Sequence, residues 1–420
     1  MDSIGAAPVT ALGARTEIDT EIDVAAERAR TVGAGLSHHF NAAGAALPSH
    51  GVIAAVVEHL RLEERYGGYE AAAAVRERSD DVYAAAAELL GANPHEIALF
   101  DSASTGLRVL MDALRAMSGT RIVASSTTYV SHAMHLMTIA RGHDADLVVA
   151  PVDAQRRLDV DALDALLADG RPTIVTVSHI PTSSGLIEPA ERIGEITRRH
   201  GATYLLDATQ SVGHLKVDVG AIGCDALVTT GRKFLRGPRG TGLAYVHESL
   251  IERLKPTAPD VRGAQWVTQS GWELSPDARR FESWESAVAA RLGLGVAVRE
   301  AIARSPESTE RWLRARAGLL RSALADIPGV MITDPEGAAS AIVTFVVDGV
   351  ECGAVVERLA ARNVRVVSVP ATHGQWDLGV RKLSSVVRAS VHVYNDDNDL
   401  GALVDAVRLV AAGRDGEARG

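Results

Sequence analysis

The feature that most constrains the fold is an alternation of short apolar runs with segments of helical period, between about residues 95 and 250. Short apolar runs rich in Val, Ile and Leu are typical of strands buried on both faces. Strands that alternate with helices form βαβ units, so the sequence predicts an α/β fold with a seven-stranded, mostly parallel sheet. The seven runs are Ile97–Phe100, Arg121–Ala124, Leu147–Ala150, Thr173–Val177, Tyr204–Leu206, Ala226–Val228 and Gly242–Val246.

The pattern changes beyond this region, which indicates a second domain. Residues 256–280 are rich in Gly, Pro, Asp and Gln and are predicted to form a loop, and a helical pattern follows over residues 286–304. A chain of 420 residues has room for two domains. We expect a large domain over residues 48–285 and a smaller α+β domain over residues 286–420, joined by the N-terminal segment 1–47.

Composition excludes several classes of protein. A formal charge of −10 argues against a nucleic-acid binder, which needs a basic face. Two cysteines exclude a disulfide scaffold and a cysteine-rich zinc module. No apolar run approaches the ~20 residues of a membrane helix, and the opening residues lack the pattern of a secretory signal. We expect a cytoplasmic protein with no metal site, no membrane contact and no nucleic-acid partner.

An acidic side chain ends one predicted strand and a lysine follows the next. Asp207 closes the run that begins at Tyr204, and Lys233 follows the run Ala226–Val228. Ligands of open α/β sheets bind at the carboxyl ends of strands, so both side chains should face one crevice. A lysine there can form a Schiff base, and pyridoxal phosphate needs such a lysine and a carboxylate on its pyridine nitrogen. Each residue alone could be a solvated surface group, whereas the pair favours a cofactor site.

Short motifs around these two residues resemble the class V branch of fold-type I pyridoxal-phosphate enzymes, which includes cysteine desulfurases, kynureninase and isopenicillin N epimerase. The motifs are Asp-x-x-Gln, Thr-Gly-Arg-Lys and Gly-Pro-x-Gly, at residues 207–210, 230–233 and 237–240. The resemblance covers roughly residues 36–410. It implies a fold-type I transferase architecture, pyridoxal 5'-phosphate as cofactor, Lys233 as the catalytic Schiff-base lysine, Asp207 on the pyridine nitrogen and Gln210 on the ring hydroxyl.

A turn of small residues after the first predicted strand resembles the family's phosphate-binding turn. Backbone N–H groups and hydroxyls at a helix start can hold a phosphate, so the resemblance implies Ser104 and Thr105 as ligands. A Ser and a His complete this site in the family. Here the two positions hold Thr230 and Arg232, whose guanidinium also binds phosphate well. The alternative is an ordinary Ser or Thr helix cap.

Two further positions match residues that contact the cofactor ring in the family. Tyr129 falls where an aromatic residue or His stacks on the ring, and the alternative is a Tyr packed under a loop. Thr182 lies in a turn that starts at His179 and resembles the family's His-x-x-Asn turn. Thr182 therefore replaces an Asn near the ring hydroxyl, which weakens that contact.

The last predicted strand resembles the family motif that binds the substrate's α-carboxylate. The motif is Arg-x-Ser followed by Tyr-Asn, and its arginine corresponds to Arg388. The resemblance implies an amino-acid substrate with a free carboxylate. Asn41 resembles a residue beside the same carboxylate, and Tyr66 is a further candidate for substrate binding. A surface Arg on an edge strand and an ordinary Asn turn are the alternatives.

Departures from the family narrow the resemblance. Cysteine desulfurases carry a nucleophilic Cys on a loop that corresponds to residues 369–379, where this chain has none. Cys224 and Cys352 lie elsewhere, so persulfide chemistry is not expected. Residues 63–69 and 281–285 are similar to a narrower set, which includes the C–S lyase of ergothioneine biosynthesis and related enzymes of lincosamide antibiotic pathways.

We therefore expect a pyridoxal-phosphate-dependent C–S lyase of secondary metabolism, which cleaves a cysteine S-conjugate by β-elimination to a thiol, pyruvate and ammonia. In this hypothesis Arg388 orients the substrate and Lys233 removes its α-proton. An epimerase would need a second acid on the opposite face, for which His39 and Tyr66 are candidates. A decarboxylation-dependent deaminase or an aminotransferase is a further alternative. The resemblance also implies a homodimer with a shared active site.

We expect four loop-like stretches to form the pocket walls around the group that the substrate carries on its sulfur. Their tryptophans and His373 suit a bulky, partly apolar group, although such residues also anchor loops. The stretches are residues 36–47, 66–69, 261–285 and 369–379.

Overall fold

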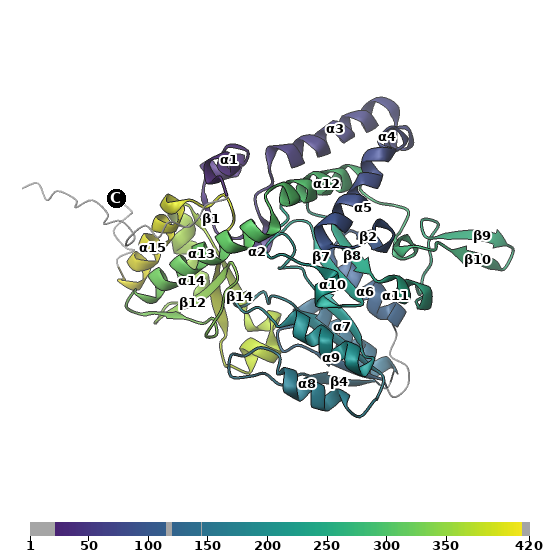
Figure 1. Ribbon diagram of the computed structural model, residues 1–420. Helices are drawn as coiled ribbons and strands as arrows, with labels where there is room; N and C mark the ends of the chain where they lie inside the picture. Colours follow the sequence, from purple (N-terminus) through teal and green to yellow (C-terminus); the bar gives the residue numbers. More distant parts are fainter. Residues whose placement is uncertain (1–21, 115–119, 144, 414–420) are drawn as a thin grey trace, which may run out of the picture.

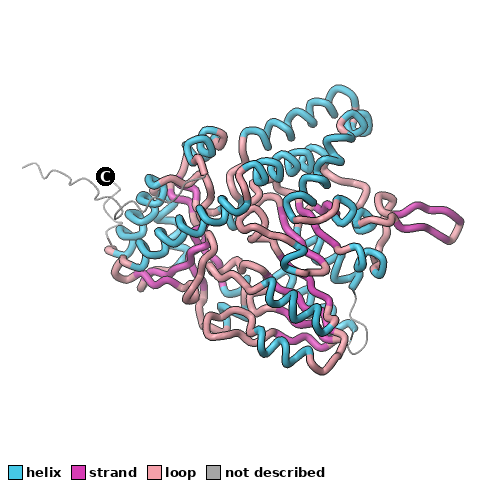
Figure 2. The backbone as a smooth tube through the Cα atoms, in the orientation of Figure 1, coloured by secondary structure: helices cyan, strands magenta, loops and turns pink. Residues whose placement is uncertain are grey.

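The computed structural model describes residues 22–114, 120–143 and 145–413, so the first 21 residues of the N-terminal segment, residues 115–119, residue 144 and residues 414–420 lie outside the described ranges. A seven-stranded sheet forms the centre of the large domain, in the order β2-β8-β7-β6-β5-β3-β4 (Figures 1 and 2). Within it only β8 runs antiparallel to its neighbours, which confirms the predicted sheet. The strands are β2 Ile97–Phe100, β3 Arg121–Ala124, β4 Asp146–Val149, β5 Thr173–Ser178, β6 Thr203–Asp207, β7 Ala226–Thr230 and β8 Gly242–Val246.

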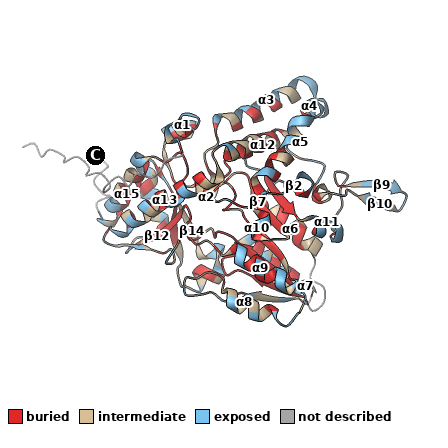
Figure 3. Cartoon of the chain, in the orientation of Figure 1, coloured by how far each residue is buried: buried red, intermediate tan, exposed pale blue. Residues whose placement is uncertain are grey.

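Helices cover both faces of this sheet, which is why its central strands are apolar throughout. On β6, Leu205 packs in one core cluster, whereas Tyr204 and Leu206 pack in another on the opposite face. Figure 3 shows the strands as part of the buried centre of the domain. The helices on the first face are α6 Ala103–Leu114, α7 Val130–His143 and α11 Glu248–Arg253, and those on the second are α5 Arg76–Leu90, α8 Val160–Leu167, α9 Ala190–His200 and α10 Val219–Ile222.

The parallel register brings the carboxyl ends of the central strands together. Ser178 at the end of β5 pairs with Asp207 at the end of β6, and Asp207 pairs with Val228 of β7. Thr230 ends β7 two residues later. Side chains that follow these strands therefore meet at one edge of the sheet, where an open α/β sheet binds its ligand.

The smaller domain is built on a four-stranded antiparallel sheet in the order β11-β12-β15-β14. The N-terminal segment joins it, because β1 (His38–His39) pairs with β13 (Val364–Arg365). Its strands are β11 Val330–Ile332, β12 Ile342–Val347, β14 Val367–Pro370 and β15 Ser385–Ser390, and its helices are α13 Pro306–Ala325, α14 Cys352–Ala361 and α15 Asp397–Ala411.

The helix α12 (Val288–Ala303) packs against the large domain. It lies along α3 (His50–Tyr66) and α5, as Figure 1 shows. The contact is close because α12 carries small residues there: a Cβ on Gly293 would lie 2.8 Å from Val56, and a Cβ on Gly295 would lie 2.9 Å from Val82. We therefore propose a domain boundary after α12 rather than at residue 285.

Three further helices are short. They are α1 (Val24–Ala29), α2 (Ala42–Ala45) and α4 (Gly68–Ala74). Across the described ranges, none of the helices combines the length and the apolar composition that crossing a membrane would require.

The stretch predicted as a loop after residue 255 contains a β-hairpin. Strand β9 (Ala264–Thr268) pairs with β10 (Gly271–Leu274), and Trp266 lies opposite Trp272. The hairpin projects from the body of the protein at the right of Figure 1. Both tryptophans are exposed. The sequence therefore lacks the alternation of buried apolar and exposed polar residues that predicts a strand.

Gly213 lies where the turn after β6 touches the backbone that follows Lys233. Its φ is +82°, a region that L-residues with side chains rarely adopt, and a Cβ there would lie 2.7 Å from the carbonyl carbon of Phe234. The position therefore carries both a conformational and a packing constraint.

We predict that Gly213→Ala lowers the free energy of unfolding by about 3 kcal/mol, since the strain of a positive φ adds to a backbone clash. Gly170→Ala is the matched control, because Gly170 has a φ of +68° with nothing within 4 Å of the added Cβ. The control should lose only about 1 kcal/mol. Urea unfolding of both variants beside the wild type measures the difference, and equal losses would contradict the packing argument.

Candidate active site

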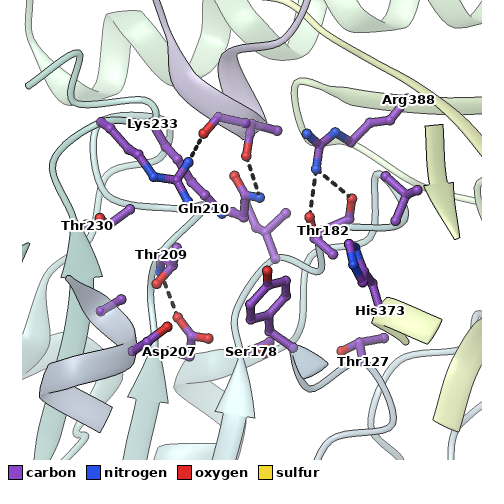
Figure 4. A pocket seen from close by; sticks show the side chains of 18 of the residues that line it. Thr127, Ser178, Thr182, Asp207, Thr209, Gln210, Thr230, Lys233, His373 and Arg388 are labelled. Atoms are coloured by element: carbon purple, nitrogen blue, oxygen red, sulfur yellow. Dashed lines mark hydrogen bonds between the residues drawn. The ribbon is translucent and has the colours of Figure 1, made fainter. Parts of the chain in front are cut away.

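A cavity of about 250 Å³ lies at the carboxyl edge of the large sheet, between the two domains (Figure 4). Strand ends supply its floor, and the N-terminal segment and the small domain supply its walls. Its polar and charged lining residues are Ser102, Ser104, Thr127, Tyr129, Ser178, Thr182, Asp207, Thr209, Gln210, Thr230, Arg232, Lys233, Ser368, His373 and Arg388.

Lys233 lies in a tight turn directly after β7. The Lys233 carbonyl accepts the Arg236 N–H at 2.9 Å, and the Gly231 N–H donates to the Thr241 carbonyl at 2.9 Å. The residue is 7% exposed. Burial holds the pKa of Lys233 well below its ordinary value, and the charges of Arg232 and Arg388 act in the same direction. The structure therefore favours the neutral amine, which is the form that acts as nucleophile or base.

Asp207 is the last residue of β6 and faces the same cavity. Its Oδ1 accepts the Thr209 N–H at 3.0 Å. Burial raises the pKa of Asp207, while its hydrogen bonds and the charge of Lys233 act in the opposite direction. A buried carboxylate of this kind is stabilised by a cationic N–H group of a ligand.

Arg388 extends from β15 into the other side of the cavity and meets two predicted neighbours. Its Nη1 donates to Thr182 Oγ1 at 2.6 Å and to the Thr182 carbonyl at 3.1 Å, and its Nη2 donates to Asn41 Oδ1 at 3.0 Å. Burial, together with the charge of Arg232, lowers the pKa of Arg388 to about 10. Its Nε is buried without a hydrogen-bond partner, so the guanidinium can still bind an anion.

The residues predicted for the phosphate all line the cavity, with one exception. Ser104, Thr230 and Arg232 line it, and Arg232 Nη1 donates to the Gly44 carbonyl. Thr105 does not line it, because its N–H and hydroxyl both lie 3.1 Å from Ser102 Oγ. Ser102 thus caps α6 and lines the cavity in place of Thr105.

Gln210 and Tyr129 also lie on the cavity wall. Gln210 Nε2 donates to the Ala43 carbonyl at 3.1 Å, which ties the N-terminal segment to the turn after β6. Gln210 Oε1 is buried with no partner. Tyr129 precedes α7 and is 36% exposed, so its ring is accessible to a ligand.

Tyr66 lies away from this cavity. It ends α3, is 63% exposed and is not among the lining residues of the described chain. The stretches 66–69 and 261–285 likewise contribute no lining residue here, whereas residues 36–47 and 369–379 do.

Sequence reasoning did not identify several polar residues of the lining. Ser178 ends β5 and Thr127 follows β3, so the strand-end rule that selected Asp207 also applies to both. Thr209 occupies a variable position of the Asp-x-x-Gln motif, so the motif does not select it. Ser102 lies outside the two positions, Ser104 and Thr105, that the resemblance implies.

The lining fits pyridoxal phosphate. A buried lysine and a buried carboxylate lie on one side, and two arginines can bind a phosphate and a carboxylate. Gln210 Oε1 and Arg388 Nε are buried polar atoms without partners, as expected where a polar ligand supplies them.

Neither cysteine of the chain belongs to this site. Cys224 and Cys352 are free and buried, and neither lines the cavity. Burial raises the pKa of the Cys224 thiol, which disfavours the reactive thiolate.

Comparison with known proteins identifies related chains. The family model "Aminotransferase class-V" matches residues 38–403. A probable hercynylcysteine sulfoxide lyase of Mycobacterium tuberculosis is 28% identical over 390 residues, which are 93% of each chain. A cysteine desulfurase of Synechococcus elongatus is 29% identical over 374 residues, and the match covers 85% of this chain but only 58% of the desulfurase.

Solved structures show the same fold. The apo structure of a cysteine desulfurase from Thermococcus onnurineus NA1 has a TM-score of 0.87 at 22% identity, with 93% of this chain and 98% of that chain covered. The cystine C–S lyase C-DES, in complex with cysteine persulfide, has a TM-score of 0.81 at 20% identity, with 90% and 99% covered. The chain is therefore a pyridoxal-phosphate-dependent enzyme and belongs to the class V aminotransferase family.

Proposed function

We propose that the protein is a C–S lyase that cleaves a cysteine S-conjugate by β-elimination to a thiol, pyruvate and ammonia. The observation that carries the proposal is the composition of the cavity. The cavity is lined by the buried Lys233 and by Arg388, whose Nε has no hydrogen-bond partner. No cysteine lines it. The lysine and arginine suit an α-amino acid, and the absence of a cysteine among the lining residues argues against persulfide formation.

Each residue has a distinct role in this reaction. Arg388, held by Thr182 and Asn41, binds the substrate carboxylate and so orients the Cα–H bond. Lys233 accepts the α-proton on Nζ, since burial favours its neutral form. Pyridoxal phosphate, when bound through Lys233, supplies a ring that accepts electrons from the α-carbon. Asp207 would hold the ring nitrogen in its protonated form, and Arg232 with Ser104 would hold the phosphate.

The similarity to the probable hercynylcysteine sulfoxide lyase supports a cysteine S-conjugate as the substrate class. A place in secondary metabolism is part of the proposal, as is a cytoplasmic location, which two free cysteines support. The geometry gives less support to an epimerase, because neither candidate for the second acid lines the cavity. His39 Nδ1 instead lies 3.0 Å from Tyr394 Oη, and Tyr66 is exposed.

Product analysis tests the proposal directly. We predict that the holoenzyme releases equal amounts of pyruvate, ammonia and ethanethiol from S-ethyl-L-cysteine. Inversion at the α-carbon without pyruvate would identify an epimerase. An aldehyde with carbon dioxide would identify decarboxylating chemistry. Either of these two results would contradict the proposal that the protein is a C–S lyase.

Substitution of the lysine tests its role. We predict that Lys233→Ala removes the visible absorption band of the lysine-bound cofactor and abolishes turnover, because the covalent link and the base are lost together. Lys216→Ala is the control, since Lys216 pairs with Glu307 on the surface. Retention of both the band and turnover in the Lys233 variant would contradict the assignment.

We also propose that the protein forms a homodimer. Ile53, Val57 and Leu60 lie on one stripe of α3 at helical spacing and are 47%, 39% and 50% exposed. The exposed Tyr69 and Trp284 line a neighbouring cavity of about 780 Å³. Exposed apolar side chains that gather in this way indicate a protein–protein contact. In the dimer, residues 283–285 and Tyr66 would be candidates to reach the partner's site.

Sedimentation velocity tests the dimer. We predict that the wild type sediments as a dimer and that Val57→Glu with Leu60→Glu yields monomers, since two charges would be buried at the interface. Leu319→Glu is the control, because Leu319 is similarly exposed, at 37%, but lies on α13 of the small domain. A monomeric wild type, or a dimeric double variant, would contradict the proposal.

A further inference from the structure

His373 is a titratable side chain on the cavity wall that the proposed roles do not use. Among the described lining residues, Asp207, Arg232, Lys233 and Arg388 have roles toward the cofactor or the substrate's carboxylate and α-proton. The other titratable groups are Tyr129 and His373. Their rings lie edge to face, with centroids 6.3 Å apart.

The segment that carries His373 is held in place at the interface between the two domains. His373 ends a short 3₁₀ helix that begins at Ala371, whose N–H donates to the Ser384 carbonyl at 2.9 Å. A few residues later the buried Asp377 pairs with Arg156 of the large domain at 2.8 Å and with Arg381 at 3.6 Å. The imidazole is therefore presented by an anchored segment, although the ring itself is solvent-accessible.

His373 lies on the side of the cavity where the β-carbon of the proposed substrate would lie. Figure 4 shows it beside Thr182 and Thr127, on the same side as Arg388 and away from Thr230 and Asp207. Because Arg388 fixes the carboxylate, the β-carbon, two bonds away from it, lies in the same half of the cavity. Val367, Ser368 and Val369 of β14 line the adjoining wall.

We propose that His373 is the general acid that protonates the sulfur leaving group. This inference rests on the proposed C–S lyase activity and deepens it. The Cα–H bond breaks and its proton passes to Lys233 Nζ, while its electron pair forms the Cα–Cβ double bond. The Cβ–S bond breaks, sulfur keeps the bonding pair, and the imidazolium of His373 gives it a proton. The three-carbon fragment leaves as an enamine, which water hydrolyses to pyruvate and ammonia.

Physical chemistry favours an imidazole in this role. An alkanethiolate is a basic leaving group, with a conjugate-acid pKa of about 8.5 for the side chain of cysteine itself. Its departure is assisted by an acid that holds a proton near neutral pH and releases it readily, which imidazole does. Such assistance is typically worth about 10²–10⁴-fold in rate. A chloride leaving group takes no proton and gains nothing from the acid.

The test compares two leaving groups in the holoenzyme of one variant. We predict that His373→Gln lowers kcat/KM for S-ethyl-L-cysteine by about 10²-fold, while kcat/KM for β-chloro-L-alanine changes by less than about threefold. Activity toward β-chloroalanine shows that the variant is folded and holds its cofactor. Thr372→Ala, on the same short helix, is the matched control and should leave both rates near the wild-type values.

The outcomes separate this inference from the proposed function. An equal loss of kcat/KM with both substrates in His373→Gln, or no loss with either, would overturn the proposed role of His373. Neither result would contradict the proposed C–S lyase activity. A selective loss in Tyr129→Phe but not in His373→Gln would assign the acid to Tyr129 and would also overturn it. If the wild type forms pyruvate from neither substrate, the proposed C–S lyase activity is refuted. The proposed role of His373 is then refuted as well, because it rests on that activity.

Discussion

The parallel pairing of β6 with β7 holds the buried side chains of Asp207 and Lys233 in one cavity, and the chemistry of the site depends on this pairing. Burial disfavours the charged form of both groups, so it raises the pKa of the carboxyl and lowers that of the amine. A protonated pyridine nitrogen would stabilise the carboxylate, and a Schiff base would consume the neutral amine. The energetic cost of burying these groups in the free protein is thus offset by cofactor binding.

The small domain and the N-terminal segment complete the site from the opposite side. Arg388 reaches Thr182 of the large domain and Asn41 of the N-terminal segment. A second buried contact connects the N-terminal segment to the large domain, because Arg236, in the turn after Lys233, pairs with Glu27 at 2.6 Å. Removal of one partner from such a buried pair is strongly destabilising. Arg388 and the turn that carries Lys233 are therefore both held by contacts with the N-terminal segment, which fixes their relative positions.

The parts of the fold predicted from sequence are those in which burial leaves a regular pattern. The seven strands are apolar because helices cover both faces, and Asp207 and Lys233 stand out as polar residues at or after the ends of such strands. The hairpin with Trp266 was missed because both of its faces are exposed, so no pattern distinguishes it from a loop. The cap formed by Ser102 and the exposure of Tyr66 depend on local geometry and tertiary packing, which residue type and spacing do not determine.

Chemical trapping of the cofactor tests the central claim, that Lys233 in this cavity binds pyridoxal phosphate covalently. The chain has only four lysines, at positions 216, 233, 255 and 382, so the attachment site can be assigned without ambiguity. Borohydride reduction of the holoenzyme, followed by peptide mass spectrometry, should place one phosphopyridoxyl group on Lys233. A label on one of the other three lysines, or no stable label, would contradict the account.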